Sequence, residues 1–181
     1  MKYFKFSVKQ LVATAIGAAL FFVLARFASI PVFANTTITF QYAIVGFFAA
    51  IFGPITGLLI GLIGHALADL SWGWGIWWSW VVASAVVGFI SGFILKAGKI
   101  EEGGFSKSDI VRFIIGSLIV HAIAWGLIAP GGDIIIYAEP ADKVFVQGLI
   151  AGAGNFVTTA VVGSLLLFGY SRTRVKSGSL E

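Results

Sequence analysis

Long apolar runs alternate with short polar stretches along the chain, and four of the runs have the length of a membrane span. A helix crosses the hydrocarbon core with roughly 20 apolar residues at about 1.5 Å per residue. The runs that meet this length are Val8–Phe27, Trp77–Leu95, Ile110–Ile128 and Val144–Phe168. We therefore expect four helices that each cross a membrane as a single segment.

A fifth apolar stretch, from residue 41 to residue 70, is too long for one upright span. It is interrupted at Gly53-Pro54, a pair that marks turns. We interpret it as a hairpin of two helices, Gln41–Phe52 and Ile55–Leu70, whose first arm either begins nearer Thr36 or lies tilted in the membrane. The pattern thus predicts an all-α fold, an integral membrane bundle of six transmembrane helices.

Composition supports lipid as the solvent of this fold. Hydrophobic residues make up 59% of the 181 residues, charged residues make up 11%, and the mean hydropathy is +0.99. A soluble domain carries about 25% charged residues, and a chain of this size leaves much of its surface outside any core. We expect one transmembrane domain, residues 1–176, followed by a polar tail, residues 177–181.

Basic residues predict the orientation of the bundle. If the N-terminus is cytoplasmic, ten of the 12 basic residues lie inside and only Arg26 and Lys143 lie outside. The ten are Lys2, Lys5, Lys9, Lys96, Lys99, Lys107, Arg112, Arg172, Arg174 and Lys176. This distribution obeys the positive-inside rule, so we expect both termini on the cytoplasmic side of the cell membrane. Because these residues border apolar runs instead of clustering on one face, we expect no nucleic-acid partner.

A cleaved signal peptide is the alternative interpretation of the first apolar run. The cleavage site would be Val32-Phe33-Ala34. However, the run is nearer to a full span than to the roughly 7–15 apolar residues of a signal peptide. Its removal would also leave five helices and an external N-terminus, so we expect the run to be retained.

Small residues recur at the spacing of helix-packing seams. The stripes are Ala15 and Ala19 in the first span, Gly57, Gly61 and Gly64 in the third helix, Ser84, Gly88 and Gly92 in the fourth, and Gly148 and Gly152 in the sixth. Such stripes let helices approach closely within a membrane. The first-span cluster is denser than internal packing needs, so we assign Ala15 and Ala19 to the docking of a partner helix.

Tryptophans gather on the predicted outer side. Five of the six are Trp72, Trp74, Trp77, Trp78 and Trp80, and the sixth, Trp125, lies near the outer end of the fifth helix. Two interpretations stay open, an aromatic belt at the membrane interface and the walls of a binding pocket. A belt should occur at both membrane faces. The cytoplasmic side has no tryptophan, which favours a pocket for at least some of them.

Polar groups within the spans show the same outward bias. His65 and Asp69 are four residues apart, as are His121 and Trp125, so each pair lies on one helical face. Intramembrane polar groups face each other or a cavity, and both interpretations stay open here. In the interpretation in which they face a cavity, they hold a small, polar, ring-shaped ligand. The predicted substrate-binding residues are Gln41, His65, Asp69, Trp72, Trp77, Trp80, His121, Trp125 and Asn155.

The two long outer loops are candidate lids. They comprise residues 29–40 and 129–143, and both mix Pro or Gly with polar and apolar residues. Loops of this kind close over substrates in many proteins, although plain connectors have the same composition.

Signatures of catalysis are missing from the sequence. There is no cysteine, no HExxH motif and no GxxxxGK[ST] phosphate-binding loop. We therefore expect no catalytic residue, no metal site and no cofactor. Active transport through such a protein would draw its energy from ions or from a partner.

The chain resembles the substrate-binding S components of energy-coupling factor (ECF) vitamin transporters over nearly its whole length. The resemblance rests on the six-span layout, the short second helix and the Ala15-xxx-Ala19 pair. It also rests on three segments, KQLVATAIGAALFFVLARFASI, IFGPITGLLIGLIGHALADL and WWSWVVASAVVGFISGF. The branch that it resembles is associated with the uptake of hydroxymethylpyrimidine, other thiamine precursors or pyridoxine.

The resemblance implies a transport mechanism. The S component would bind a vitamin from outside, a membrane scaffold (T) component would meet the face of Ala15 and Ala19, and two cytoplasmic ATPases would drive reorientation and release. It does not imply which residues contact the substrate. Two alternatives remain, a solitary proton-coupled carrier that uses His65 and Asp69, and an assembly subunit without a ligand.

Overall fold

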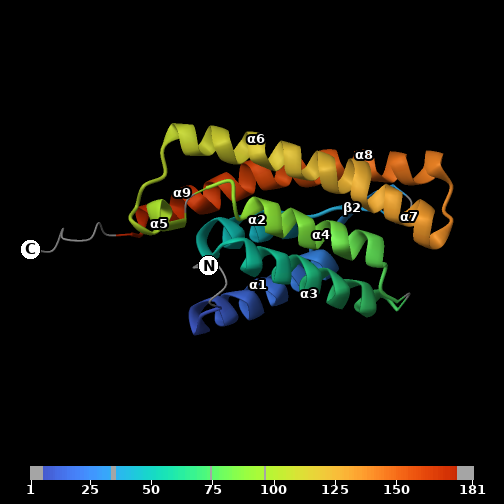
Figure 1. Cartoon of the computed structure of the whole chain (residues 1–181), viewed down its shortest axis with the longest axis horizontal. Coiled ribbons are helices and arrows are strands. Elements are labelled where there is room, and N and C mark those ends of the chain that lie inside the picture. The colour runs from blue at the N-terminus through green and yellow to red at the C-terminus, as the bar shows by residue number, and fades with distance from the viewer. Residues whose placement is uncertain (1–5, 34–35, 74, 96, 175–181) are drawn as a thin grey trace, which may run out of the picture.

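The computed structural model describes residues 6–33, 36–73, 75–95 and 97–174, which form an elongated helical bundle (Figure 1). Several residues with predicted roles lie outside these ranges: Lys2, Lys5, Ala34, Trp74, Lys96, Lys176 and the tail 177–181.

The elements follow the predicted order. In the first half they are α1 (Val8–Phe27), β1 (Ile30–Phe33), β2 (Thr36–Ile38), α2 (Gln41–Phe52), α3 (Pro54–Trp72) and α4 (Trp78–Ser91). In the second half they are α5 (Ala97–Glu101), α6 (Lys107–Ile123), the π-helical turn η1 (Ala124–Ile128), α7 (Ala129–Tyr137), α8 (Ala141–Thr158), the π-helical turn η2 (Thr159–Gly163) and α9 (Ser164–Arg172). The first span has the predicted bounds, and the two strands form a small antiparallel ribbon within the otherwise helical fold.

Four helical rods are long and apolar enough to cross a membrane, namely Val8–Phe27, Pro54–Trp72, Lys107–Tyr137 and Ala141–Arg172. Helices α2 and α4 are apolar but have only 12 and 14 residues, about 18 and 21 Å at 1.5 Å per residue. The hydrocarbon core is about 30 Å thick. The count of six spans therefore stays a prediction for these two helices.

The fourth helix is shorter than the sequence pattern predicts, because it ends at Ser91 instead of Leu95. The next residue, Gly92, lies against the backbone of Pro54 at the start of α3, where any side chain would overlap main-chain atoms. The chain leaves the helix at this contact.

The predicted loop over residues 129–143 is wrong, because most of it is helix. Helix α7 continues the rod to Tyr137, and only residues 138–140 connect it to α8. Pro130 does not break the rod. Proline is tolerated in the first turn of a helix, and here the irregular turn η1 directly precedes it. The other candidate lid, residues 29–40, contains the β1–β2 ribbon.

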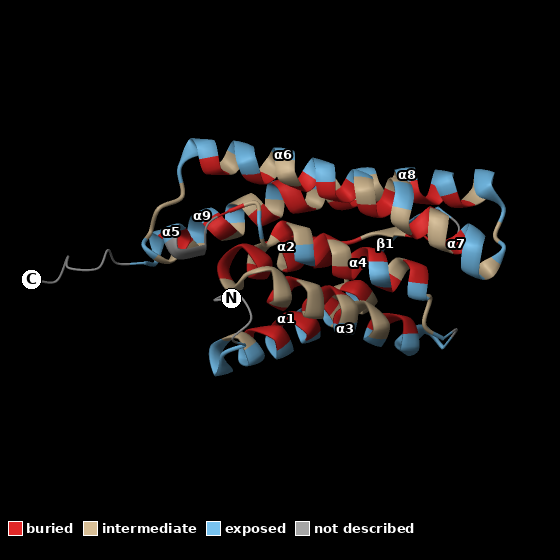
Figure 2. Cartoon of the chain, viewed as in Figure 1, coloured by how far each residue is buried: buried red, intermediate tan, exposed pale blue. Residues whose placement is uncertain are grey.

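Glycines allow α3 to pack closely against α1 and α4. A side chain at Gly61 would overlap the backbone of Ser84 on α4, and one at Gly64 would overlap Phe21 on α1. The predicted seams on α3 and α4 are thus confirmed as internal contacts. Because α1 packs along α3, the first apolar run is part of the bundle, and buried residues face inward along each helix (Figure 2).

The start of α1, the short α5 and the end of α9 lie toward one end of the bundle, and the α3–α4 connection and α7 lie toward the other (Figure 1). Two ion pairs join elements at the first end, Lys9 Nζ to Glu101 Oε1 at 2.5 Å and Lys99 Nζ to Asp109 Oδ2 at 2.6 Å. The bundle thus places these basic residues together, as the orientation argument requires. The assignment of this end to the cytoplasm stays a prediction.

Candidate functional site

Two adjoining cavities lie at the end of the bundle that carries the α3–α4 connection. The first, which we call the ribbon chamber, has a volume of about 220 Å³, and its polar walls include Thr36, Thr37, Thr39, Gln41 and Asn155. The second, which we call the acidic chamber, has a volume of about 240 Å³, and its walls include Trp77, Asp133, Glu139, Lys143 and Gln147. Because His65, Asp69 and Trp80 line both, the two chambers form one site.

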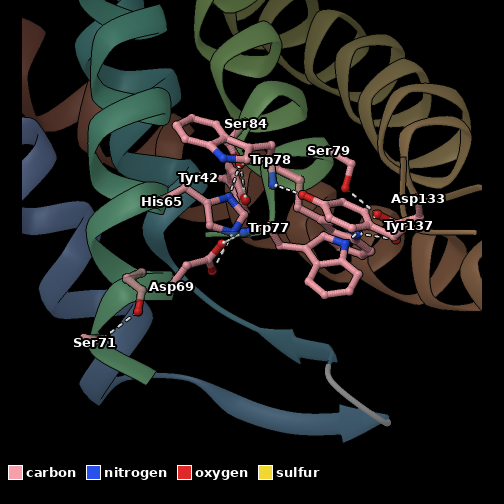
Figure 3. A network of polar contacts seen from close by, with 12 residues as sticks. Tyr42, His65, Asp69, Ser71, Trp77, Trp78, Ser79, Ser84, Asp133 and Tyr137 are labelled. Atoms are coloured by element: carbon pink, nitrogen blue, oxygen red, sulfur yellow. Dashed lines mark hydrogen bonds and ion pairs between the residues drawn. The ribbon is translucent and has the colours of Figure 1, made fainter. Parts of the chain in front are cut away.

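A hydrogen-bond network around Ser84 holds the wall that the chambers share (Figure 3). The Ser84 hydroxyl donates to the carbonyl oxygen of Trp80 at 3.0 Å, so it accepts from Tyr42 Oη at 2.8 Å and from His65 Nδ1 at 2.5 Å. His65 Nδ1 thus donates to Ser84 in this arrangement, and His65 Nε2 lies 3.5 Å from Asp69 Oδ1. The sequence-predicted pairing of His65 with Asp69 is present, and both residues also line the chambers.

Asp133 joins α7 to the start of α4 (Figure 3). Its Oδ1 accepts from Trp77 Nε1 at 2.6 Å and from the Ser79 hydroxyl, and its Oδ2 accepts from Trp80 Nε1 at 2.7 Å. Indole N–H groups are donors only, so both oxygens act as acceptors, as those of an ionised carboxylate do. The Trp77 ring also stacks on Tyr137 with 4.1 Å between ring centroids. These contacts fix both indoles at the acidic chamber.

Seven of the nine predicted substrate-binding residues lie around the two chambers. Six line the ribbon chamber, namely Gln41, His65, Asp69, Trp72, Trp80 and Asn155. Trp77 lines the acidic chamber.

His121 and Trp125 are not among the described residues that line either chamber. Both are 1% exposed, and they bond to each other, since Trp125 Nε1 donates to His121 Nδ1 at 2.8 Å. His121 Nε2 lies 3.1 Å from Thr159 Oγ1, and the Trp125 ring lies behind Trp80 with 5.3 Å between centroids. This pair supports the wall of the site from behind.

The tryptophans divide between the two interpretations of their cluster. Trp72 and Trp78 are 40% and 50% exposed, as in an interfacial belt, and Trp77 and Trp80 are less exposed and turned toward Asp133. Trp72 has both features, because it also lines the ribbon chamber and lies under the guanidinium of Arg26, 4.1 Å from the ring centroid.

Sequence reasoning missed Asp133, Tyr42 and the threonines of the ribbon. Asp133 lies in the stretch interpreted as a loop, and the spacing of four residues to Tyr137 is the one signal that marks a helical face there. Tyr42 reads as an ordinary apolar position of α2, yet its hydroxyl bonds to Ser84. The threonines enter the site only through the fold of the ribbon.

Three buried polar atoms of the ribbon chamber have no hydrogen-bond partner among the described residues. They are Gln41 Oε1, Asn155 Oδ1 and Thr39 Oγ1. Their residues are 6%, 4% and 2% exposed. Nearly all buried polar atoms in native proteins are hydrogen-bonded, and an unpaired one costs about 1–3 kcal/mol. Three such atoms around one cavity point to a polar ligand.

Solved structures share this fold. FolT bound with folic acid superposes with a TM-score of 0.65 at 16% identity, over 89% of this chain and 98% of that one. The S component for biotin from an ECF-type ABC transporter superposes with a TM-score of 0.61 at 19% identity, over 88% of this chain and 89% of that one. At these identities the likeness concerns the fold.

Sequence relatives extend over nearly the whole chain. A UPF0397 protein of an Exiguobacterium species is 51% identical over 177 residues, 97% of both chains. A UPF0397 protein of Lactococcus lactis subsp. cremoris is 48% identical over 176 residues, again 97% of both chains. The profile of the family described as "ECF-type riboflavin transporter, S component" matches residues 5–172. The chain therefore belongs to this family of ECF transporter S components, which are multi-pass substrate-binding proteins of the cell membrane.

Proposed function

We propose that this S component captures a small nitrogen heterocycle, a vitamin or precursor of the hydroxymethylpyrimidine or pyridoxine type, in the ribbon chamber. The observation that carries the proposal is the set of unpartnered buried polar atoms on Gln41, Asn155 and Thr39. Membership in a family of vitamin-binding transport subunits supports it.

The chemistry of the chamber suits such a ring. A primary amide presents a donor and an acceptor side by side, so Gln41 and Asn155 can each pair with a heterocycle edge that carries both. Trp72 and Trp80 supply aromatic walls for stacking. A chamber of about 220 Å³ is below the roughly 300–1,000 Å³ of drug-sized sites, which favours a single small ring there.

We further propose that the protein docks to a T component through the outward face of α1 and that two ATPases of the same complex drive release. Ala15 and Ala19 are exposed, whereas Ala13, Gly17 and Ala18 of the same cluster are buried against the bundle. The exposed pair therefore leaves a smooth strip on the lipid-facing side, where a partner helix can approach closely.

The ligand is tested with purified protein. Mass spectrometry of co-purified small molecules and quenching of tryptophan fluorescence by hydroxymethylpyrimidine, pyridoxine and riboflavin identify the class that binds. Asn155→Ala and Gln41→Ala should each weaken binding about 10- to 100-fold, the effect of roughly 1.4–3 kcal/mol. Ser117→Ala is the matched control, because Ser117 Oγ is also buried and unpartnered but does not line either chamber. Unchanged affinity in both site variants would contradict the proposal.

The second candidate function is a solitary proton-coupled carrier. The observation that favours it is the His65–Asp69 pair, which lies at both chambers. Liposomes that contain this protein alone separate the two functions. Uptake of the bound vitamin driven by a proton gradient would support the carrier, and uptake that requires ATP and the partner subunits would support the importer.

A further inference from the structure

The acidic chamber carries an excess of negative charge. Three carboxylates line it, those of Asp69, Asp133 and Glu139, together with one lysine, Lys143. Glu139 and Lys143 form an ion pair at 2.5 Å, and Asp69 faces His65. Asp133 is therefore the carboxylate of this chamber that forms no ion pair with any described residue.

The hydrogen bonds of Asp133 come from neutral groups, two indoles and one hydroxyl. The residue is 2% exposed and lies within the apolar rod α6–η1–α7. Burial of a charge without a counter-ion is costly, and neutral donors offset only part of that cost. Acidic groups within the spanning segments of membrane proteins generally face a cation or a ligand path.

The walls beside Asp133 are aromatic. Trp77 and Trp80 turn their N–H edges toward the carboxylate, and each has one ring face covered, by Tyr137 and by Trp125 respectively. Both indoles also line the acidic chamber. Indole faces next to a carboxylate are a common environment for organic cations, because the ring quadrupole and the negative charge act in the same direction.

The two chambers differ in chemistry but share a wall. The ribbon chamber presents the unpartnered amide oxygens of Gln41 and Asn155, and none of its described lining residues is Lys or Arg. Trp80, His65 and Asp69 belong to both cavities. A molecule that fills both would place a hydrogen-bonding ring on one side of Trp80 and a second group on the other.

We propose that the ligand has two parts, a heterocyclic ring in the ribbon chamber and a cationic group in the acidic chamber beside Asp133. The cation is a protonated amine or an alkylated ring nitrogen. This inference rests on the proposed function and narrows its substrate class, because a carboxylate or phosphate in the second position is repelled by Asp133.

Three pyridines with one ring and different side groups test the charge preference. They are 3-(aminomethyl)pyridine, which is cationic, 3-(hydroxymethyl)pyridine, which is neutral, and pyridine-3-carboxylate, which is anionic. Affinities for the wild-type protein in nanodiscs are measured by tryptophan fluorescence and checked by calorimetry. We expect the amine to bind at least tenfold more tightly than the alcohol, and the carboxylate to bind most weakly.

Asp133→Asn removes the charge and keeps the size of the side chain. It should abolish the preference for the amine, so that the affinities for the amine and the alcohol differ by less than about threefold, which is below 1 kcal/mol. Glu101→Gln, which removes a carboxylate at the other end of the bundle, should change neither affinity. If Asp133→Asn shows no thermal transition and therefore does not fold, the inference is judged from the affinities of the three pyridines for the wild-type protein alone.

Equal affinities for the amine and the alcohol, or a preference for the carboxylate, would overturn the inference and leave the proposed heterocycle site intact. Tighter binding of riboflavin, which is uncharged and has three fused rings, together with no effect of Asp133→Asn, would contradict both the inference and the single small ring of the proposed function. Failure of all three pyridines to bind the wild-type protein at about 10 mM, a free energy weaker than roughly 3 kcal/mol, would overturn the inference and the proposed function together.

Discussion

Gly57 on α3 and Gly88 on α4 meet backbone to backbone, and a Cβ atom on either residue would overlap main-chain atoms of the other. Main-chain atoms cannot turn aside as a flexible side chain can. The contact between the two helices thus requires glycine at both positions. It also places Ser84, one turn from Gly88, where its hydroxyl bonds to His65 across the seam.

The first prediction concerns this seam. Gly88→Val should destabilise the protein by at least about 1–3 kcal/mol, the usual cost of overpacking, and lower its thermal transition in detergent. It should also weaken ligand binding, because separation of α3 from α4 breaks the bond between His65 and Ser84. Gly169→Val is the matched control, since a Cβ at Gly169 meets nothing within 4 Å. Equal transition temperatures for the two variants would show that the helices do not need this contact.

The second prediction assigns His121 to the support of the site. His121→Leu removes the acceptor of the Trp125 indole N–H and the partner of Thr159, which costs about 1–3 kcal/mol for the buried group left unpaired. We expect a lower thermal transition with ligand affinity changed by less than about threefold. His121→Gln, which can restore one of the bonds, should recover part of the loss. A large loss of affinity at unchanged stability would instead make His121 a ligand contact.

Much of the fold follows from local signals in the sequence. The length of the first apolar run gives α1 with its bounds, and Gly53-Pro54 separates α2 from α3 because proline begins a helix well and cannot continue one. Continuity of the rod Lys107–Tyr137 was not predictable in this way. Its Pro130-Gly131-Gly132 sequence is typical of a loop, and the π-helical turn that accommodates it has no recognisable pattern in the sequence.

Spacing within a helix predicts which polar residues share a face, but not what they face. His65–Asp69 and His121–Trp125 have the same spacing, yet the first pair lines the chambers and the second is buried behind them. Asp133 shows the converse limit. Its importance depends on indoles 53 and 56 residues away in the sequence, and tertiary structure alone brings them together.

The third prediction tests the docking face of α1. Ala15→Trp should prevent co-purification with the T component and the ATPases of the same complex, because a large side chain fills the strip where a partner helix would pack. Ligand affinity should be unchanged, since the residue is exposed and lines neither chamber. The control is Leu165→Trp, which introduces the same side chain at a 65% exposed position of α9. Complex formation by Ala15→Trp, or its loss in both variants, would contradict the assignment.

The fourth prediction concerns orientation, and the absence of native cysteine makes it directly measurable. Glu102→Cys lies near the end of α5, and Ala141→Cys lies at the start of α8, at opposite ends of the bundle, and both positions are exposed. Because the basic residues gather at the α5 end, the positive-inside rule places that end in the cytoplasm. A membrane-impermeant maleimide should therefore label Ala141→Cys, and not Glu102→Cys, in intact cells.

In inside-out vesicles the labelling pattern should reverse, and the cysteine-free parent gives the background in both preparations. Labelling of Glu102→Cys in intact cells would place the α5 end outside and would also move both chambers to the cytoplasmic side. Capture of a vitamin from outside would then be impossible in this conformation. Labelling of both variants from one side would mean that the rod between them, Lys107–Tyr137, does not cross the membrane as a single span.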